Sequence, residues 1–230
     1  MSKSENKRQL ISFLEPKSPI SEAYRALRTN IDFSSIDEKI QVIMTTSASP
    51  GEGKSTTIAN LAVVYAQADK RVVLIDADLR KPTAHHTFGV SNRKGLSSVL
   101  SRQCELHEAV QSTHVPNLSV ITSGPIPPNP SEMVASGRMS ALIEELRNQF
   151  DIILIDTPPT LAVTDAQIVA TKVDGTILVL DSGKVKRDMV MKAKQQLAQV
   201  NANILGVVLN NIKKKNSDGY YYYYYSNAEN

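Results

Sequence analysis

The residues best suited to chemistry lie in a glycine-rich segment that joins an apolar run to a helical pattern. It reads Ala48-Ser49-Pro50-Gly51-Glu52-Gly53-Lys54-Ser55-Thr56, with Ala48 where the usual pattern has its first glycine. Glycines let backbone N–H groups turn inward around an anion, and the start of a helix adds favourable partial charge. Lys54 can then reach the β- and γ-phosphates, and the Ser55 hydroxyl can bind Mg²⁺. The segment predicts a phosphate-binding loop.

Three aspartates stand at the ends of predicted strands. Asp76 and Asp156 each follow four apolar residues, and Asp78 comes two residues after Asp76. Because ligands of an open parallel sheet bind at the carboxyl ends of its strands, all three should face the phosphate-binding loop. A carboxylate there can bind Mg²⁺ or accept a proton from a nucleophile. The residues predict a Mg²⁺-dependent nucleoside triphosphate site, and leave open whether water or a hydroxyl group receives the phosphoryl group.

The elements that position these residues alternate between strand and helix. The strands are rich in Val, Ile and Leu without alternation, as in a parallel sheet buried on both faces. This order predicts an α/β, doubly wound, mostly parallel sheet in one domain over 21–210, preceded by an arm (1–20) and followed by a flexible tail (211–230). Strands are expected at 41–45, 71–76, 118–122, 152–156, 176–180 and 204–209, and helices at 54–68, 130–150, 165–172 and 186–200.

Composition narrows the class of protein. Of 230 residues, 21% are charged and 41% hydrophobic, which excludes a collagen, a coiled-coil rod and a wholly disordered chain. A net charge of +3 gives no argument for a nucleic-acid partner. The single Cys104 excludes an internal disulfide and fits a reducing compartment. No apolar run approaches the about 20 residues of a membrane span, so we expect a cytoplasmic protein whose membrane role requires a partner.

The chain carries six consecutive tyrosines near its end. They are Tyr220, Tyr221, Tyr222, Tyr223, Tyr224 and Tyr225. Such a run could be a low-complexity segment that aggregates, but beside a phosphate-binding loop it becomes a phosphoacceptor candidate. The run begins ten positions after Asn210, and this stretch could span roughly 35 Å, enough to reach a neighbouring subunit. Asn210, after the last predicted strand, is a candidate contact for the nucleotide base.

Four segments together resemble the bacterial tyrosine kinases of capsule and exopolysaccharide synthesis, in the form without a transmembrane segment. These are the phosphate-binding loop, Leu74-Ile75-Asp76-Ala77-Asp78-Leu79-Arg80-Lys81-Pro82, Ile155-Asp156-Thr157-Pro158-Pro159, and a helix with the E-x-x-R-x-x-R pattern formed by Glu22, Arg25 and Arg28. The resemblance covers the chain from about Lys17 and includes the tyrosine cluster. It implies a P-loop NTPase fold and an ATP- and Mg²⁺-dependent protein-tyrosine kinase.

The resemblance also implies roles for residues. Lys54 would bind the phosphates, with Ser55 on the metal. Asp76 would be the base for the tyrosine hydroxyl, and Asp78 and Asp156 would act on the metal directly or through water. The tyrosine cluster would be the autophosphorylation site, and we expect a neighbouring copy of the chain to phosphorylate it in trans. The helix with Glu22, Arg25 and Arg28 would join subunits into a ring.

The partners implied are a membrane adaptor whose cytoplasmic tail activates the kinase, a cognate tyrosine phosphatase, and polysaccharide-synthesis enzymes as substrates. Recruitment by the adaptor would bring the protein to the inner face of the plasma membrane. The alternative class is the partition and cell-division ATPases, nucleotide-dependent switches with a related fold. They typically carry a Lys-Gly pair where this chain has Ser49-Pro50, and they do not usually end in a tyrosine run.

Overall fold

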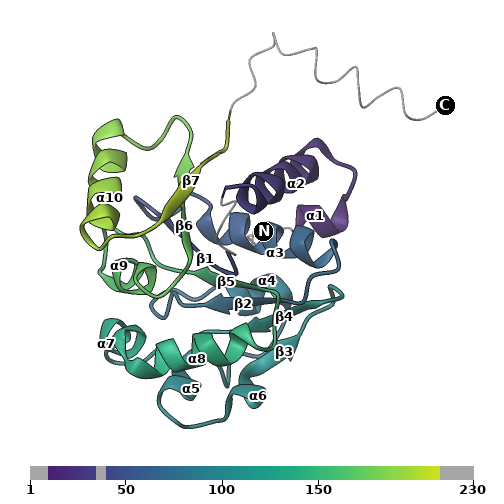
Figure 1. Ribbon diagram of the computed structural model, residues 1–230, viewed down its shortest axis with the longest axis vertical. Coiled ribbons are helices and arrows are strands. Elements are labelled where there is room, and N and C mark those ends of the chain that lie inside the picture. The colour runs from purple at the N-terminus through teal and green to yellow at the C-terminus, as the bar shows by residue number, and fades with distance from the viewer. Residues whose placement is uncertain (1–9, 35–39, 213–230) are drawn as a thin grey trace, which may run out of the picture.

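Seven strands form one sheet in the order β3-β4-β2-β5-β1-β6-β7 (Figure 1). The computed structural model describes residues 10–34 and 40–212, so the tyrosine cluster lies outside the described residues. The strands are β1 (Val42–Ser47), β2 (Val72–Asp76), β3 (Val110–Ser112), β4 (Leu118–Ile121), β5 (Ile152–Asp156), β6 (Gly175–Asp181) and β7 (Ile204–Asn210). All pairings are parallel except that of β3 with β4, which confirms the predicted doubly wound, mostly parallel sheet.

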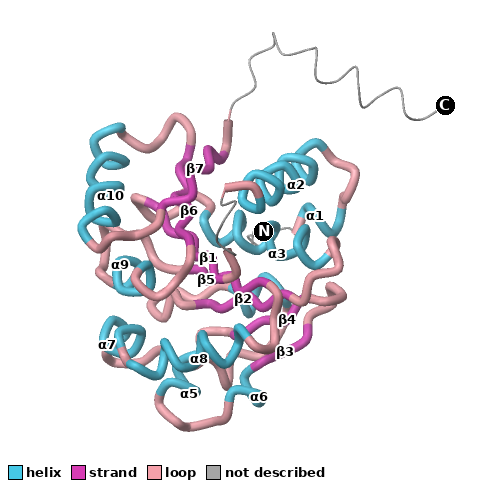
Figure 2. Tube along the Cα trace, viewed as in Figure 1, coloured by secondary structure: helices cyan, strands magenta, loops and turns pink. Residues whose placement is uncertain are grey.

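Helices cover both faces of this sheet (Figure 2). One face carries α1 (Ile11–Leu14), α2 (Pro19–Asp32), α3 (Lys54–Ala66) and α4 (Ala84–Phe88). The other carries α5 (Leu96–Leu100), α6 (Leu106–Ala109), α7 (Pro130–Ala135), α8 (Gly137–Arg147), α9 (Asp165–Ala170) and α10 (Arg187–Gln199). Among the described residues, none of the helices is both long and apolar enough to cross a membrane.

The core explains why the central strands are apolar without alternation. Val42 and Met44 of β1 belong to the hydrophobic cluster under α8 and α9, whereas Ile43 between them belongs to the cluster under α3. Successive side chains of a strand point to opposite faces, and here both faces are covered. Each position of the strand is therefore buried.

Two stretches differ from the sequence-based expectation. Residues 10–20, assigned to the N-terminal arm, include α1 and the start of α2, and Leu10 and Ser12 are buried. Ser12 N donates to Asn60 Oδ1 of α3 at 2.9 Å, a long-range contact that no local pattern announces. The single helix expected over 130–150 is two helices, because Ser136 has extended backbone angles (φ −60°, ψ 152°).

Candidate active site

The glycine-rich segment forms the loop between β1 and α3. Gly51 and Gly53 have φ values of +83° and +91°, which L-residues with side chains rarely adopt. A Cβ on Gly53 would lie 1.9 Å from Asn210 Nδ2, so a side chain there would displace the Asn210 amide from the loop. Asn210 donates to the Glu52 carbonyl at 3.1 Å, which joins the end of β7 to the loop.

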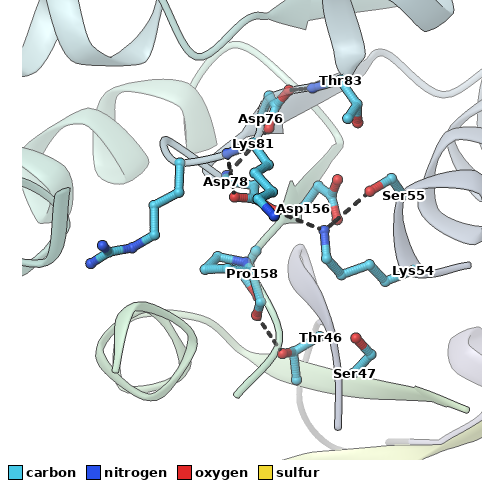
Figure 3. A network of polar contacts seen from close by, with 12 residues as sticks. Thr46, Ser47, Lys54, Ser55, Asp76, Asp78, Lys81, Thr83, Asp156 and Pro158 are labelled. Carbon is cyan, nitrogen blue, oxygen red and sulfur yellow. Dashed lines mark hydrogen bonds and ion pairs between the residues drawn. The ribbon is translucent and has the colours of Figure 1, made fainter. Parts of the chain in front are cut away.

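Lys54 is the centre of a network that joins three elements (Figure 3). Its Nζ lies 3.1 Å from Ser55 Oγ on α3, 3.2 Å from Asp78 Oδ2 after β2, and 3.3 Å from Asp156 Oδ1 at the end of β5. Burial opposes the charge on Lys54, but the carboxylates of Asp156 and Asp78 outweigh it and raise the pKa of the ammonium. Lys54 is therefore a firmly charged cation in a buried site.

The oxygen atoms around Lys54 are of the kind that Mg²⁺ prefers. They are one hydroxyl and two carboxylates, a hard-ligand set. Within residues 10–34 and 40–212 there is no group of three or more His, Cys, Asp or Glu side chains placed to hold a metal. The set fits an ion that takes its remaining ligands from nucleotide phosphates and water. Ser55, Asp78 and Asp156 are thus suited to share such an ion with a nucleotide.

Asp76 lies behind this network. It is opposite Asp156 in the pairing of β2 with β5 and is completely buried. Its Oδ1 accepts a hydrogen bond from the backbone of Asp78 at 3.2 Å, and its Oδ2 accepts two at 2.8 Å from the backbone of Thr83 and Ala84. Burial, then the nearby Asp156, raise the pKa of Asp76 to about 7. A carboxyl group with that pKa can exchange a proton near neutral pH.

Burial also raises the pKa of Asp156, although Lys54 opposes the shift. The attraction of the single ammonium does not fully offset the removal of this carboxylate from water. The site therefore concentrates more negative charge than it neutralises. A further cation is the natural complement of such a site.

A cavity of about 590 Å³ opens in front of these groups. The phosphate-binding loop and α3 form one wall of the cavity, and Asp78 also lines it, whereas Asp76 and Asp156 do not. The opposite wall comes from the loop after β5, which Thr46 Oγ1 fixes by donating to the Pro158 carbonyl at 2.8 Å. The remaining lining residues, which sequence reasoning did not assign to the site, are Arg80, Lys81, Thr83, Pro158, Pro159, Ala162 and Val163. Arg80, Lys81 and the two prolines lie within the segments that carry the family resemblance, but no spacing rule points to Thr83, Ala162 or Val163.

The predicted assembly residues lie on α2, outside the cavity lining. Arg25 Nε contacts Glu22 Oε2 at 2.6 Å, which keeps both side chains on the helix surface. Arg28 Nη1 donates to the Val64 carbonyl of α3 at 2.9 Å. Arg28 therefore also secures α2 against the domain.

A lysine-bearing phosphate-binding loop between a strand and a helix, facing aspartates at the ends of parallel strands, defines a P-loop nucleotide-binding α/β protein. The AAA domain family matches residues 40–203. The chain is 50% identical over 206 residues to tyrosine-protein kinase YwqD of Bacillus subtilis (strain 168), covering 90% of this chain and 87% of the relative.

Solved structures agree with this relation. The chimerical protein CapA2B2 has a TM-score of 0.87 and 44% identity, covering 89% of this chain and 90% of that one. The septum site-determining protein MinD from Pyrococcus horikoshii OT3, solved with Mg-ADP, has a TM-score of 0.66 and 25% identity, covering 76% and 72%. The chain belongs to the bacterial tyrosine-protein kinases.

Proposed function

We propose that this chain transfers the γ-phosphoryl group of ATP, bound with Mg²⁺, to tyrosine hydroxyls, and that Tyr220–Tyr225 are its own acceptors. The observation that carries the proposal is the convergence of Lys54, Ser55, Asp78 and Asp156 around one point beside the phosphate-binding loop. Phosphoryl transfer depends on positioning and on stabilising charge, and this cluster supplies both signs of charge in a buried setting.

Each residue has a separate task in this proposal. Residues 49–56 surround the phosphates and donate backbone N–H groups to them, except Pro50, which has none, with the Lys54 ammonium on the β- and γ-phosphates. Ser55, Asp78 and Asp156 hold Mg²⁺, which when bound neutralises phosphate charge. Asp76, assigned as the base from the family resemblance, accepts the proton of the tyrosine hydroxyl. Its pKa of about 7 supports this role, although Asp76 lies behind Asp78 and does not line the cavity. Asn210 contacts the base, supported by its place against Gly53.

Acceptor tyrosines reach the site from a neighbouring copy. β7 runs parallel to β6, so the chain leaves the described structure at Ile212 on the same edge as the phosphate-binding loop. The ten residue-to-residue steps from Asn210 to Tyr220 can span roughly 35 Å. The ring proposed for the family's helix pattern places Glu22, Arg25 and Arg28 at the joint between subunits.

Phosphorylation should reverse this assembly. Each phosphotyrosine carries about −1.5 to −2 charges, so six add roughly −9 to −12 to a chain whose net charge is +3. The acceptor site already holds Asp76, Asp78 and Asp156, so the modified cluster is expelled and copies repel one another. A phosphatase resets the cycle, and a membrane adaptor recruits and activates the kinase at the inner face of the membrane for capsule or exopolysaccharide synthesis.

Mass spectrometry of the purified chain after incubation with Mg-ATP, with and without the adaptor's cytoplasmic tail, tests the central proposal. Phosphate should accumulate on Tyr220–Tyr225, and not in the Lys54→Met variant. Replacing the six tyrosines with Phe should abolish self-modification while transfer to an added tyrosine polymer continues. ATP hydrolysis without any phosphotyrosine would instead favour the alternative, a partition-type ATPase switch, to which the MinD structure is a fold relative.

Light scattering tests the assembly. Lys54→Met, which stays unphosphorylated, should form the larger species, and autophosphorylated wild type should be monomeric at matched salt and concentration. Equal masses would refute the switch. The double variant Arg25→Ala, Arg28→Ala should be monomeric in both states. Large assemblies of that variant would exclude α2 as the joint.

A further inference from the structure

A buried carboxylate outside the proposed mechanism lies next to the cavity. Asp165 is the first residue of α9, and its side chain is 1% exposed. Arg80 donates to it twice, from Nε to Oδ2 at 2.9 Å and from Nη2 to Oδ1 at 3.1 Å. Ser131 Oγ of α7 contacts the same Oδ1 at 2.5 Å and accepts from Arg80 Nη2 at 2.9 Å. The three side chains close a triangle across three segments.

The position of Arg80 in the chain gives this triangle its meaning. Arg80 comes two residues after Asp78, in the loop that joins β2 to α4. Ala77 N, at the start of the loop, donates to the Asp156 carbonyl of β5 at 2.8 Å. The contacts that follow are local: Lys81 N donates to Asp78 Oδ1 at 3.0 Å, and Asp76 accepts from the backbone of Thr83 and Ala84. These local bonds set the shape of the loop after Ala77 but do not fix that part against the opposite wall of the cavity.

Two ion pairs tie the loop to other elements. Lys54 pairs with Asp78, but under the proposed function this ammonium must also serve the phosphates. Arg80 pairs with Asp165, and its partners on α7 and α9 are not nucleotide ligands in that proposal. If nucleotide draws Lys54 away from Asp78, the pair of Arg80 with Asp165 is the ion pair that still ties this loop to the opposite wall.

We propose that Arg80, Asp165 and Ser131 form a latch, and that Arg80 is a positioning residue that holds Asp78 in register with Asp156 for phosphoryl transfer. The inference rests on the proposed function for the reaction it serves. A bidentate guanidinium–carboxylate pair fixes direction as well as distance, which a lysine cannot reproduce. Arg80 lines the same cavity as Ala162 and Val163, so the latch ties the loop after β2 to the wall formed by the loop after β5.

An alternative is that Arg80 binds phosphate directly, since it lines the cavity and is 38% exposed. The two roles separate in a double-mutant cycle. If Arg80 acts through Asp165, its replacement has no further effect once Asp165 has been neutralised. If it touches the nucleotide, the effect persists.

The experiment compares wild type, Arg80→Lys, Asp165→Asn and the double variant in the full chain. A poly(Glu,Tyr) polymer is the acceptor, and a fluorescent ADP analogue reports nucleotide affinity. We expect each single variant to lower kcat by about 10- to 100-fold, the range for a misplacement near 1 Å, with nucleotide affinity within about twofold. The kcat of the double variant should match that of Asp165→Asn. Neither of these two variants leaves an unpaired buried anion, so both should remain folded.

Arg147→Lys is the matched control. Arg147 makes a comparable bidentate pair with Asp174 away from the cavity, so this variant should lose stability with kcat unchanged. The latch is overturned if Arg80→Lys keeps wild-type kcat, or if it lowers kcat or nucleotide affinity equally with and without Asp165→Asn. If wild type transfers nothing to tyrosine, the proposed function fails, and the same cycle on ATP hydrolysis still decides the latch.

Discussion

The two edges of the central sheet carry similar charged residues in opposite electrostatic states. At the carboxyl edge, burial raises the pKa values of Asp76 and Asp156. At the amino edge, Arg71 lowers the pKa of Asp151 to about 2. Burial there also opposes the charge on Asp174, but hydrogen bonds from Arg147 and the backbone of Val42 and Gln41 outweigh it and lower its pKa.

The difference lies in burial as well as in donors: Asp76 and Asp156 are almost completely buried, whereas the side chains of Asp174 and Asp151 are 23% and 35% exposed. Asp174 accepts from the Gln41 and Val42 backbone at 2.9 and 2.8 Å and from both terminal nitrogens of Arg147, so four donors serve one carboxylate. At the other edge, one ammonium is shared between Asp78 and Asp156. The amino edge is built for stability, whereas the carboxyl edge keeps unsatisfied charge for a ligand.

The largest expected effect is that of Lys54→Met at the carboxyl edge. The change removes the ammonium that Asp78 and Asp156 share, together with the proposed contact to the phosphates. Tyrosine phosphorylation should fall by at least about 100-fold, since electrostatic stabilisation dominates this chemistry. Circular dichroism should show a folded chain. Normal phosphotyrosine formation would contradict the assignment of the nucleotide site.

Asp76→Asn and Asp78→Asn should separate two tasks within the same edge. An amide cannot accept the hydroxyl proton, so Asp76→Asn should lose about 100-fold or more in transfer while Mg-nucleotide binding persists. Asp78→Asn should weaken Mg-nucleotide binding itself, because a proposed metal ligand is lost. Calorimetric titration with Mg-ADP beside a transfer assay measures both. Loss of nucleotide binding in Asp76→Asn would show that Asp76 acts chiefly in the metal site. The assignment of Asp76 as the base would then be wrong.

Asp174→Asn should show the reverse behaviour at the amino edge. The change weakens the four hydrogen bonds that the Asp174 carboxylate accepts, two from the backbone of Gln41 and Val42 and two from the terminal nitrogens of Arg147. The free energy of unfolding should fall by about 1–2 kcal/mol, as for charge-assisted bonds at a partly exposed site. Urea denaturation measures the loss. Activity per folded molecule should be unchanged, and a clear drop in kcat would blur the distinction between the edges.

Asp151→Asn should have the smallest effect, and one that depends on pH. The folded-state pKa of Asp151, about 2, lies below its ordinary value of 3.8, so its contribution is present above that value and lost as pH falls through about 2. The variant should have a slightly lower urea midpoint than wild type at pH 7, and the gap should narrow as pH approaches 2. A gap that widens on acidification would reverse the assigned sign.

Short-range patterns determined much of this protein. The phosphate-binding loop and the buried strands could be predicted because they depend on neighbours a few residues apart: glycine at positive φ, lysine at a helix start, and four apolar residues before an aspartate. Parallel order then placed Asp76, Asp78 and Asp156 on the edge that holds Lys54. The fold class followed from alternation of strand and helix.

Contacts between distant residues were decided only by the tertiary structure. Arg80 and Asp165 are 85 positions apart, and no spacing rule pairs them. The packing of Ser12 on Asn60 turns part of a predicted arm into α1, and the extended backbone of Ser136 divides a helix that local propensity would continue. In each case the deciding energy comes from a surface built by another part of the chain. The sequence thus specified which groups meet at the sheet edge, and the tertiary structure specified which carboxylates each cation contacts: Asp78 and Asp156 for Lys54, and Asp165 for Arg80.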